Sequence, residues 1–136
     1  MTAGYSGTPL IKKLSLKDGM RAWFHAMPEC VRTEIGEVTL DERPAPEPGL
    51  QVAHIFTTDH AELERPLADL RTLIDPAGFL WVSWPKKASK VPTDITEDVI
   101  REICLPMGWV DVKVCAIHAT WSGLKLMIRK ELRRIR

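Results

Sequence analysis

The sequence predicts an α/β domain in which helices cover both faces of a mostly parallel sheet, with an antiparallel hairpin at its C-terminal end. The segment 79–84 (F-L-W-V-S-W) is almost wholly apolar, which is typical of a strand buried on both faces. Strand and helix patterns alternate from residue 50 to residue 105, which favours parallel strands joined by right-handed crossovers. Two alternating segments, 109–119 and 124–128, follow each other across a short turn. These patterns predict a single three-layer, Rossmann-like domain over residues 1–136.

The composition is that of an ordinary globular protein. Apolar residues make up 45% of the 136 residues and charged residues 27%, and a chain of this length can bury about two-thirds of its unfolded surface. The formal net charge is +1, so the overall charge does not indicate a polyanionic partner. The N-terminus lacks the apolar core of a signal sequence, and no apolar run approaches the roughly 20 residues that span a bilayer. We therefore expect a cytoplasmic protein without a membrane segment.

Helix and strand patterns alternate in the N-terminal third of the chain. In order, we expect a helix over 8–14, a strand over 20–27, a helix over 28–32 and a short strand over 37–40. The first helix has a cap residue, Thr8, followed by Pro9 at a position that tolerates proline. Three prolines within 44–48 predict an extended loop before the next strand.

The rest of the chain contains the strongest patterns. We expect a strand over 50–57, a helix over 61–74, the central strand over 78–84, a helix over 95–105 and the hairpin strands 109–119 and 124–128. Pro66 is compatible with the first of these helices only near its first turn. The segment 75–78 (D-P-A-G) reads as a turn, and Pro85 is expected to end the pairing of the central strand. The segment 121–123 (W-S-G) is expected to form the hairpin turn.

Two resemblances to known families follow from these segments. The order of patterns from residue 50 to residue 128, with D-P-A-G-F-L at 75–80, resembles the C-terminal half of class I S-adenosylmethionine-dependent methyltransferases. More closely, the strings G-Y-S-G-T-P-L at 4–10, W-P-K-K at 84–87 and T-W-S-G-L at 120–124 resemble a small bacterial family of domains of unknown function. The first resemblance implies a methyltransferase-like fold, and the second implies no reaction.

The methyltransferase resemblance implies a cofactor site that these residues do not reproduce. In that family, closely spaced glycines after the first strand let the backbone approach the cofactor, and an acidic residue ending the second strand takes the ribose hydroxyls. Here residues 25–30 read H-A-M-P-E-C, and residues 27–49 are too few for two further strand–helix–strand units. Asp41 or Glu42 could take the ribose role, but no glycine loop accompanies them. We expect no cofactor, and our first hypothesis is a degenerate methyltransferase-like domain that serves as a binding or regulatory module.

Candidate ligand-binding residues follow the predicted strands at the edge where α/β proteins bind ligands. Lys86 and Lys87 could hold a small anion, with Trp84 as a flat wall. The N-terminal residues Tyr5, Ser6 and Thr8 form a polar loop that could close over the same edge. The alternative interpretation is a solvated basic loop and a tethered terminus. If the site is functional, the protein could also be an enzyme, either a minimal methyltransferase or one that uses another small anion, so enzyme activity stays open.

Candidate partner contacts lie near the C-terminus. Trp121 and Ser122 could contact a protein partner, because exposed tryptophans often anchor interfaces, but Trp121 could equally be a core residue. The basic tail 129–136 raises a third hypothesis, an accessory protein that binds nucleic acid, although its apolar spacing favours an amphipathic turn with extended arginines. A small anionic ligand or a protein is thus favoured over nucleic acid as partner, and self-association stays open.

The sequence predicts neither a catalytic residue nor a metal site. The four histidines, His25, His54, His60 and His118, lack the spacing of metal ligands, and His54 lies in an apolar strand as a core residue would. Asp59 beside His60, and Asp94 near Glu97 and Asp98, could be acid–base pairs, but turn and helix-cap roles explain them better. Cys104 and Cys115 are expected to be small core residues.

Overall fold

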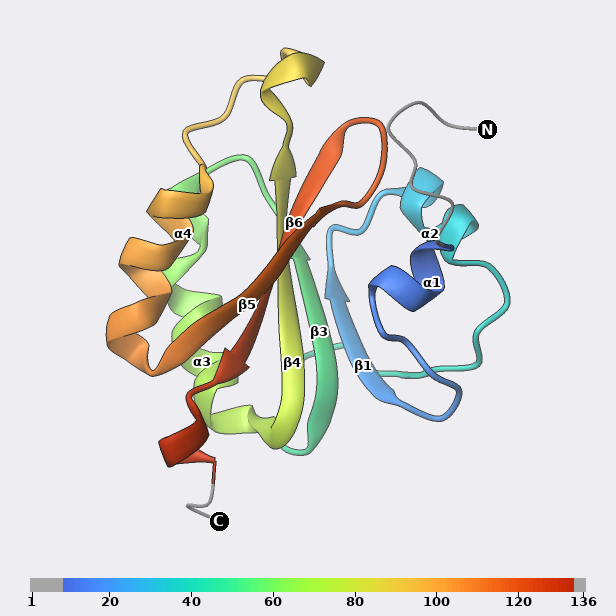
Figure 1. The fold of residues 1–136 in the computed structure, drawn as a ribbon. Coiled ribbons are helices and arrows are strands. Elements are labelled where there is room, and N and C mark those ends of the chain that lie inside the picture. Colours follow the sequence, from blue (N-terminus) through green and yellow to red (C-terminus); the bar gives the residue numbers. More distant parts are fainter. Residues whose placement is uncertain (1–8, 134–136) are drawn as a thin grey trace.

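The computed structural model describes residues 9–133, which form a six-stranded mixed sheet (Figure 1). In spatial order the strands are β2 (Asp41–Glu42), β1 (Arg21–His25), β3 (Leu50–Phe56), β4 (Ile74–Pro85), β6 (Trp121–Ile128) and β5 (Trp109–Ala116). The first three pairings are parallel and the last two are antiparallel. The predicted fold class, a mostly parallel sheet with a C-terminal antiparallel hairpin, is confirmed.

Helices cover both faces of the sheet. The helices are α1 (Leu10–Lys13) and α2 (Glu29–Ile35) on one face, and α3 (Glu64–Leu73) and α4 (Glu97–Cys104) on the other (Figure 1). Four single helical turns complete the description: η1 (His60–Glu62), η2 (Lys87–Ser89), η3 (Leu105–Met107) and η4 (Lys130–Leu132). Pro66 is the third residue of α3, within the first turn that tolerates it. No helix in the described part of the chain is long and apolar enough to cross a membrane.

Strand β4 is the centre of the sheet, as its apolar run predicts. Every residue from Gly78 to Pro85 is buried, between β3 on one side and β6 on the other. The predicted turn at 75–78 lies inside this strand and not before it, because Ile74 pairs with Leu50 while the next pair joins Phe79 to Val52. The intervening residues bulge out of the ladder, and Asp75 accepts a hydrogen bond from the Ala77 amide at 3.0 Å.

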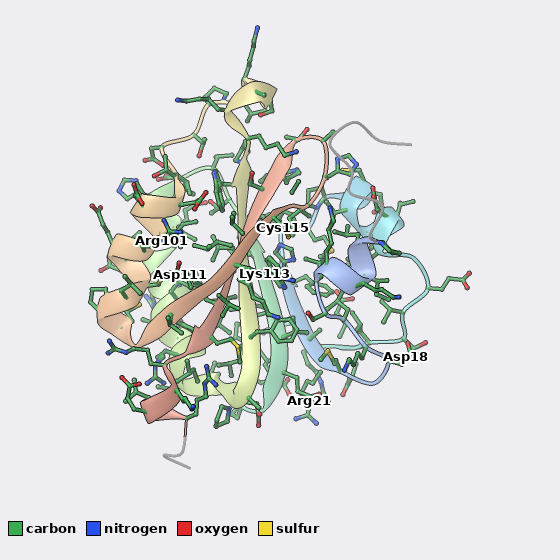
Figure 2. The ribbon with its side chains drawn as sticks, viewed as in Figure 1. Asp18, Arg21, Arg101, Asp111, Lys113 and Cys115 are labelled. Carbon is green, nitrogen blue, oxygen red and sulfur yellow. The ribbon has the colours of Figure 1, made fainter. Side chains whose placement is uncertain are left out.

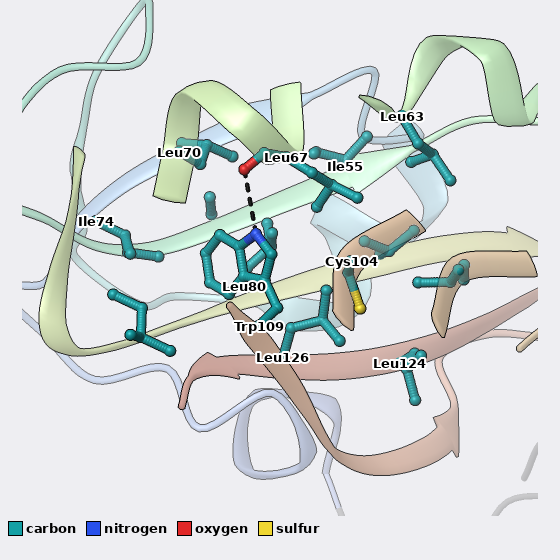
Figure 3. Close-up of a cluster of buried hydrophobic side chains, with 14 of the residues drawn as sticks. Ile55, Leu63, Leu67, Leu70, Ile74, Leu80, Cys104, Trp109, Leu124 and Leu126 are labelled. Carbon is teal, nitrogen blue, oxygen red and sulfur yellow. Dashed lines mark hydrogen bonds between the residues drawn. The ribbon is translucent and has the colours of Figure 1, made fainter. Parts of the chain in front are cut away.

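The larger apolar core lies between the sheet and the α3–α4 layer (Figure 3). Trp109 from β5 is fully buried there, and its indole Nε1 donates a hydrogen bond to the Leu67 carbonyl of α3 at 3.1 Å. Cys104 of α4 packs in the same core, as expected, and burial raises the pKa of its thiol to about 11. The edge strand β5 is thereby fixed to the helices as well as to β6.

A second core fills the opposite face, under α1 and α2. Trp81 of β4 is its largest fully buried side chain, and its Nε1 donates to the Leu14 carbonyl just after α1 at 3.2 Å. Leu10 and Leu14 bury the apolar side of this short helix. A helix of four residues is too short to be stable alone, so packing on the sheet holds α1 in place. Cys115, expected in a core, lies only half-buried beside this cluster.

Two further sequence predictions about local structure are wrong. The strand expected at 37–40 is instead the two-residue strand β2, which begins at Asp41, where the backbone pairs with Arg21. The hairpin turn occupies residues 117–120, and the segment 121–123 starts β6. Gly123 suggests a turn, but it is needed for packing, since a Cβ there would lie 2.7 Å from Ile117 and 3.2 Å from Trp81.

Candidate functional site

The order in which the chain adds strands to the sheet changes direction at β1. After β1 the chain adds β2 on one side and then β3 on the other side, so the two crossover connections diverge at the carboxyl ends of β1 and β3. In open α/β sheets, ligands bind outside the carboxyl ends of the strands at such a point. The carboxyl end of β4 lies along the same edge, at the top of Figure 1. A ligand site is therefore expected at this edge of the sheet.

The turn after β1 keeps an unusual backbone without a glycine. Ala26 is exposed and has a φ of +57°, in the left-handed region. For a residue with a Cβ, this region costs about 1–2 kcal/mol relative to ordinary conformations. Pro28 then caps α2 with extended dihedrals. The turn thus adopts a glycine-type conformation, while the alanine methyl group takes the space that a close backbone approach would need.

Replacing Ala26 by glycine is expected to stabilise the protein by about 0.5–1 kcal/mol. The gain is the relieved left-handed strain minus the larger backbone entropy of glycine in the unfolded chain. Urea unfolding measures the change directly. The matched control is Ala68→Gly in α3, where the backbone is helical and the same substitution should destabilise by about 1 kcal/mol. Equal effects at the two positions would contradict the strain at Ala26.

The acidic residues of β2 are held by arginines. Arg32 of α2 donates from both terminal nitrogens to the two oxygens of Glu42, each at 3.0 Å, and this hydrogen bonding raises the pKa of Arg32. Asp41 accepts from Arg43 at 2.8 Å, and Arg21 lies 3.7 Å from the same carboxylate. These are the two residues to which the methyltransferase resemblance assigns the ribose hydroxyls. Both already have cationic partners within the protein.

A cleft of about 670 Å³ opens beyond the end of β4, between η2 and the start of α4. We call it the strand-end cleft; its lining includes Trp84, Lys86, Lys87, Lys90, Arg101 and Ser122. The structure thus places the predicted residues Trp84, Lys86 and Lys87 around one cavity, and adds Lys90 to them. Trp84 is only 7% exposed and packs in the larger core, so it forms the floor of the cleft and not a free stacking surface.

Among the cationic residues around the strand-end cleft, Arg101 is paired with carboxylates and, within the described chain, the three lysines are not. The guanidinium of Arg101 contacts Glu97 at 3.0 Å, Asp98 at 3.1 Å and Asp111 at 3.0 Å, and the hydrogen bond to Asp111 contributes most to raising its pKa. Lys86, Lys87 and Lys90 have no carboxylate within 4.0 Å among residues 9–133. Their ammonium groups, together with the hydroxyl group of Ser122, are donors suited to a small anion.

The two candidate partner contacts point to opposite faces of β6. Ser122 lines the strand-end cleft on the α4 side and pairs with Trp84 across the β4–β6 ladder. Trp121 packs against the opposite core, edge-on to Phe56 with ring centroids 5.2 Å apart. Neighbouring residues of a strand face opposite sides, so they do not form one patch. The predicted residues Tyr5, Ser6 and Thr8 lie outside the residues that the structure describes.

A buried polar pair lies inside the sheet close to this edge, and sequence reasoning missed it. His54 of β3 and Ser83 of β4 share a hydrogen bond of 2.7 Å between Nε2 and Oγ. His54 is 1% exposed, stacks on Phe56 and is kept neutral, since burial lowers its pKa to about 3. A base of so low a pKa, out of contact with water, is poorly suited to activate the serine. The expectation that His54 is a core residue is confirmed.

A second missed pair joins the loop after β3 to the loop before α4. The Nδ1 atom of His60 is hydrogen-bonded to the Asp94 carboxylate, whose other oxygen accepts from the His60 amide at 2.9 Å. Asp59 lies beside them, with one ligand atom from each residue within 4.8 Å of the others, but all three residues are exposed. Asp59 already accepts from the Ala61 amide at 2.9 Å. The arrangement ties two loops together and pairs His60 with Asp94, not with its sequence neighbour Asp59.

The pKa of His60 is expected to lie above 6.5 in the folded protein and to fall towards 6.5 in Asp94→Asn. The hydrogen bond to Asp94 raises the pKa of His60, and hydrogen bonds from His60 lower that of Asp94. A raised folded pKa means that the pair stabilises the fold below about pH 6.5 and loses this effect as the pH rises through the folded value. Titration of the imidazole signals by NMR tests this, and an unchanged pKa in Asp94→Asn would contradict it.

The fold is that of S-adenosylmethionine-dependent methyltransferases. An S-adenosylmethionine-dependent methyltransferase from Aquifex aeolicus superposes with a TM-score of 0.65 over 88% of this chain and 87% of its own, at 18% identity. A protein assigned as a type 11 methyltransferase from Sulfolobus solfataricus gives 0.64 over 88% and 89%, at 9% identity. A structure described as a pericyclic reaction enzyme gives 0.57 over 90% of this chain and 47% of its own, at 8% identity. No protein-family model and no curated protein matches the sequence.

Proposed function

We propose that this chain is a degenerate methyltransferase-like domain that lacks a working S-adenosylmethionine site and acts as a binding or regulatory module. The observation that carries the proposal is the Arg32–Glu42 pair. A ribose that binds Glu42 would compete with a two-point ion pair that engages both carboxylate oxygens at 3.0 Å. Its diol would donate hydrogen bonds to the carboxylate but would not supply the positive charge that Arg32 supplies.

The turn after β1 supports the same proposal. In the resembled family this turn approaches the cofactor through glycines, whereas here Ala26 carries a methyl group at the left-handed position and the next glycine in the chain is Gly36. The short segment between β1 and β3 supplies one helix, α2, and one two-residue strand, β2. Two separate parts of the expected cofactor site are therefore altered together.

The module's own ligand, in this proposal, is a small anion bound in the strand-end cleft. A volume of about 670 Å³ is within the range of small-molecule sites. Lys86, Lys87 and Lys90 supply positive charge there, while the two carboxylates of the lining, Glu97 and Asp98, are paired with Arg101. The same cleft supports the second candidate function, a small enzyme with its site at the carboxyl ends of the strands. The likeness to a pericyclic reaction enzyme is compatible with a reaction other than methyl transfer on this fold.

The third hypothesis, nucleic-acid binding through the basic tail, has less support. Arg133 donates from Nε to the Ile128 carbonyl at 2.6 Å, and Arg129 lies 3.8 Å from Glu131. These contacts favour an amphipathic final turn, η4, over a free basic arm. A cytoplasmic setting, and membership of the bacterial family that carries the G-Y-S-G-T-P-L, W-P-K-K and T-W-S-G-L strings, remain parts of the proposal.

Thermal unfolding in the presence of candidate ligands tests the proposal. The protein is heated with S-adenosylmethionine, S-adenosylhomocysteine, phosphate or mononucleotides, at constant ionic strength. A ligand at 100 times its dissociation constant stabilises by about 2.7 kcal/mol. We expect no shift with the first two ligands and a shift with an anion that Lys86→Glu/Lys87→Glu reduces and Lys17→Glu leaves unchanged. A shift with S-adenosylmethionine would overturn the degenerate-site proposal. The absence of a shift with every anion tested would overturn the proposal that the strand-end cleft binds an anion.

A further inference from the structure

Three lysines gather on the side of the β5–β6 hairpin that faces α1, away from the strand-end cleft. Lys113 of β5 pairs directly with Lys125 of β6 in the antiparallel ladder, so both side chains project from the same face. Lys13 of α1 approaches the next part of β5, where its Nζ donates to the Ala116 carbonyl at 3.3 Å. Burial raises the pKa of the Cys115 thiol, and the charges of Lys113, Lys13 and Lys125 act against that rise. Figure 2 shows Lys113 and Cys115 following one another along β5.

Lys125 is held in place as a partly buried cation. Its Nζ lies 4.4 Å from the centroid of the Phe79 ring and donates to the Ser15 hydroxyl at 3.3 Å. The ring face attracts the ammonium, and both contacts restrict an otherwise flexible side chain. Burial, and then the charge of Lys113, lower the pKa of Lys125. The ammonium group is thus pre-positioned at an energetic cost.

No carboxylate of the described chain offsets the charges of Lys113 and Lys125. Within residues 9–133, neither Lys113 nor Lys125 has an Asp or Glu oxygen within 4.0 Å, whereas Arg32, Arg43 and Arg101 all do. Like charges directly opposite each other on paired strands are destabilising. Lysine on an edge strand such as β5 can serve to prevent edge-to-edge pairing. That role accounts for Lys113 but not for Lys125, which lies on the inner strand β6.

We propose that Lys113 and Lys125, with Lys13 beside them, form a binding site for a phosphate group. A phosphate carries up to two negative charges near pH 7 and would replace the repulsion between the lysines with attraction to a shared anion. Lysine ammonium groups act as point charges with rotatable donors, which suits a tetrahedral phosphate, whereas this protein holds planar carboxylates such as Glu42 with arginine. The site is independent of the strand-end cleft.

Inorganic phosphate is the first probe. Added to the full chain against sodium chloride of equal ionic strength, it should raise the Tm and shift the NMR signals of the Lys113 and Lys125 side chains saturably. In Lys113→Glu the phosphate-dependent change of the Lys125 NMR signal should be lost, yet the Tm without phosphate should rise by about 1–4 °C, because an opposite-charge pair replaces a like-charge pair. A misfolded variant would lose binding and would also have a lower Tm. Loss of the phosphate response together with a higher Tm therefore excludes misfolding as its cause.

The matched control is Lys86→Glu/Lys87→Glu, which alters the strand-end cleft and should leave the Lys125 signal responding to phosphate as before. Adenosine monophosphate and a single-stranded DNA oligonucleotide, compared with inorganic phosphate, distinguish a mononucleotide phosphate from a nucleic-acid backbone as its natural source. Equal responses to phosphate and chloride, or an unchanged phosphate response in Lys113→Glu, would overturn the proposal.

Cys115 provides a second readout that does not depend on stability. In a Cys30→Ser protein Cys115 is the thiol left to react, because Cys104 is buried. The ratio of its reaction rate with anionic iodoacetate to its rate with neutral iodoacetamide should be higher in this protein than in Lys113→Glu/Cys30→Ser. Phosphate should slow the iodoacetate reaction selectively in the protein that retains Lys113. A ratio of the two rates that is unaffected by Lys113→Glu and by phosphate would contradict a cationic pocket around this thiol.

Discussion

Replacing Trp109 by alanine is expected to lower the free energy of unfolding by about 3–5 kcal/mol. The indole is fully buried between β5, α3 and α4, and the substitution leaves a large cavity in the larger core (Figure 3). It also removes the hydrogen bond from Nε1 to the Leu67 carbonyl, which joins the edge strand to α3. Urea unfolding followed by circular dichroism measures the loss, and 3–5 kcal/mol is a large part of the stability of a domain this size.

The matched control for this prediction is Trp121→Ala. Trp121 is also a hairpin tryptophan, but its ring is only half-buried at the start of β6, so its removal exposes less apolar surface and should cost clearly less. Equal losses for the two substitutions would show that the α3–α4 core does not hold β5 in the way the packing indicates.

Lowering the pH from 7 to 5 is expected to cost about 2 kcal/mol of stability through His54 alone. The unfolded histidine has a pKa near 6.5, whereas burial lowers the folded value to about 3. Between these values the unfolded state binds a proton that the folded state does not, so stability falls as the pH falls below about 6.5. The effect has the opposite sign to that of His60, whose folded pKa is raised.

The double variant His54→Leu/Ser83→Ala tests the assignment. Replacing both partners of the buried hydrogen bond by apolar groups avoids leaving an unsatisfied one and removes the titrating imidazole. The loss of stability between pH 7 and pH 5 should shrink by about 2 kcal/mol in this variant, and should persist in the control His25→Gln, which alters an exposed histidine at the end of β1. An unchanged pH dependence in the double variant would exclude His54 as its source.

Much of the fold could be predicted because strong local patterns and the tertiary structure agree. The apolar run of β4 and the helical spacing in α3 both appear in the structure as expected. The errors arose where packing overrides local chemistry. Gly123 reads as a turn residue but allows Ile117 and Trp81 to approach β6, and the D-P-A-G segment lies in a bulge of β4.

The candidate site was only partly predictable for a related reason. Lys86 and Lys87 could be found because they follow an obvious strand, but the cleft beside them also needs Lys90 and the start of α4. The Arg32–Glu42 and His60–Asp94 pairs join residues 10 and 34 positions apart, which no local pattern reveals. The Lys113–Lys125 pair depends on the register of the hairpin, which was predicted with its turn misplaced.

The methyltransferase-like fold and the proposed loss of its cofactor are separate statements. The superposition on methyltransferases at 18% identity or less establishes the architecture alone. The proposal of a degenerate site rests on three residues of this chain: Ala26 in its left-handed turn, and Glu42 held by Arg32. In this proposal these residues, and not the fold, decide whether S-adenosylmethionine binds.

Isothermal titration of the full chain with S-adenosylhomocysteine is the most direct test of that claim. We predict no saturable heat up to millimolar ligand in the unaltered protein at pH 7.5. Under the same conditions a methyltransferase that binds the compound serves as the positive control for ligand quality. A saturable isotherm with a micromolar dissociation constant, weakened by Glu42→Gln, would show that Glu42 binds the ribose hydroxyls of the ligand. This result would contradict the account of a degenerate site.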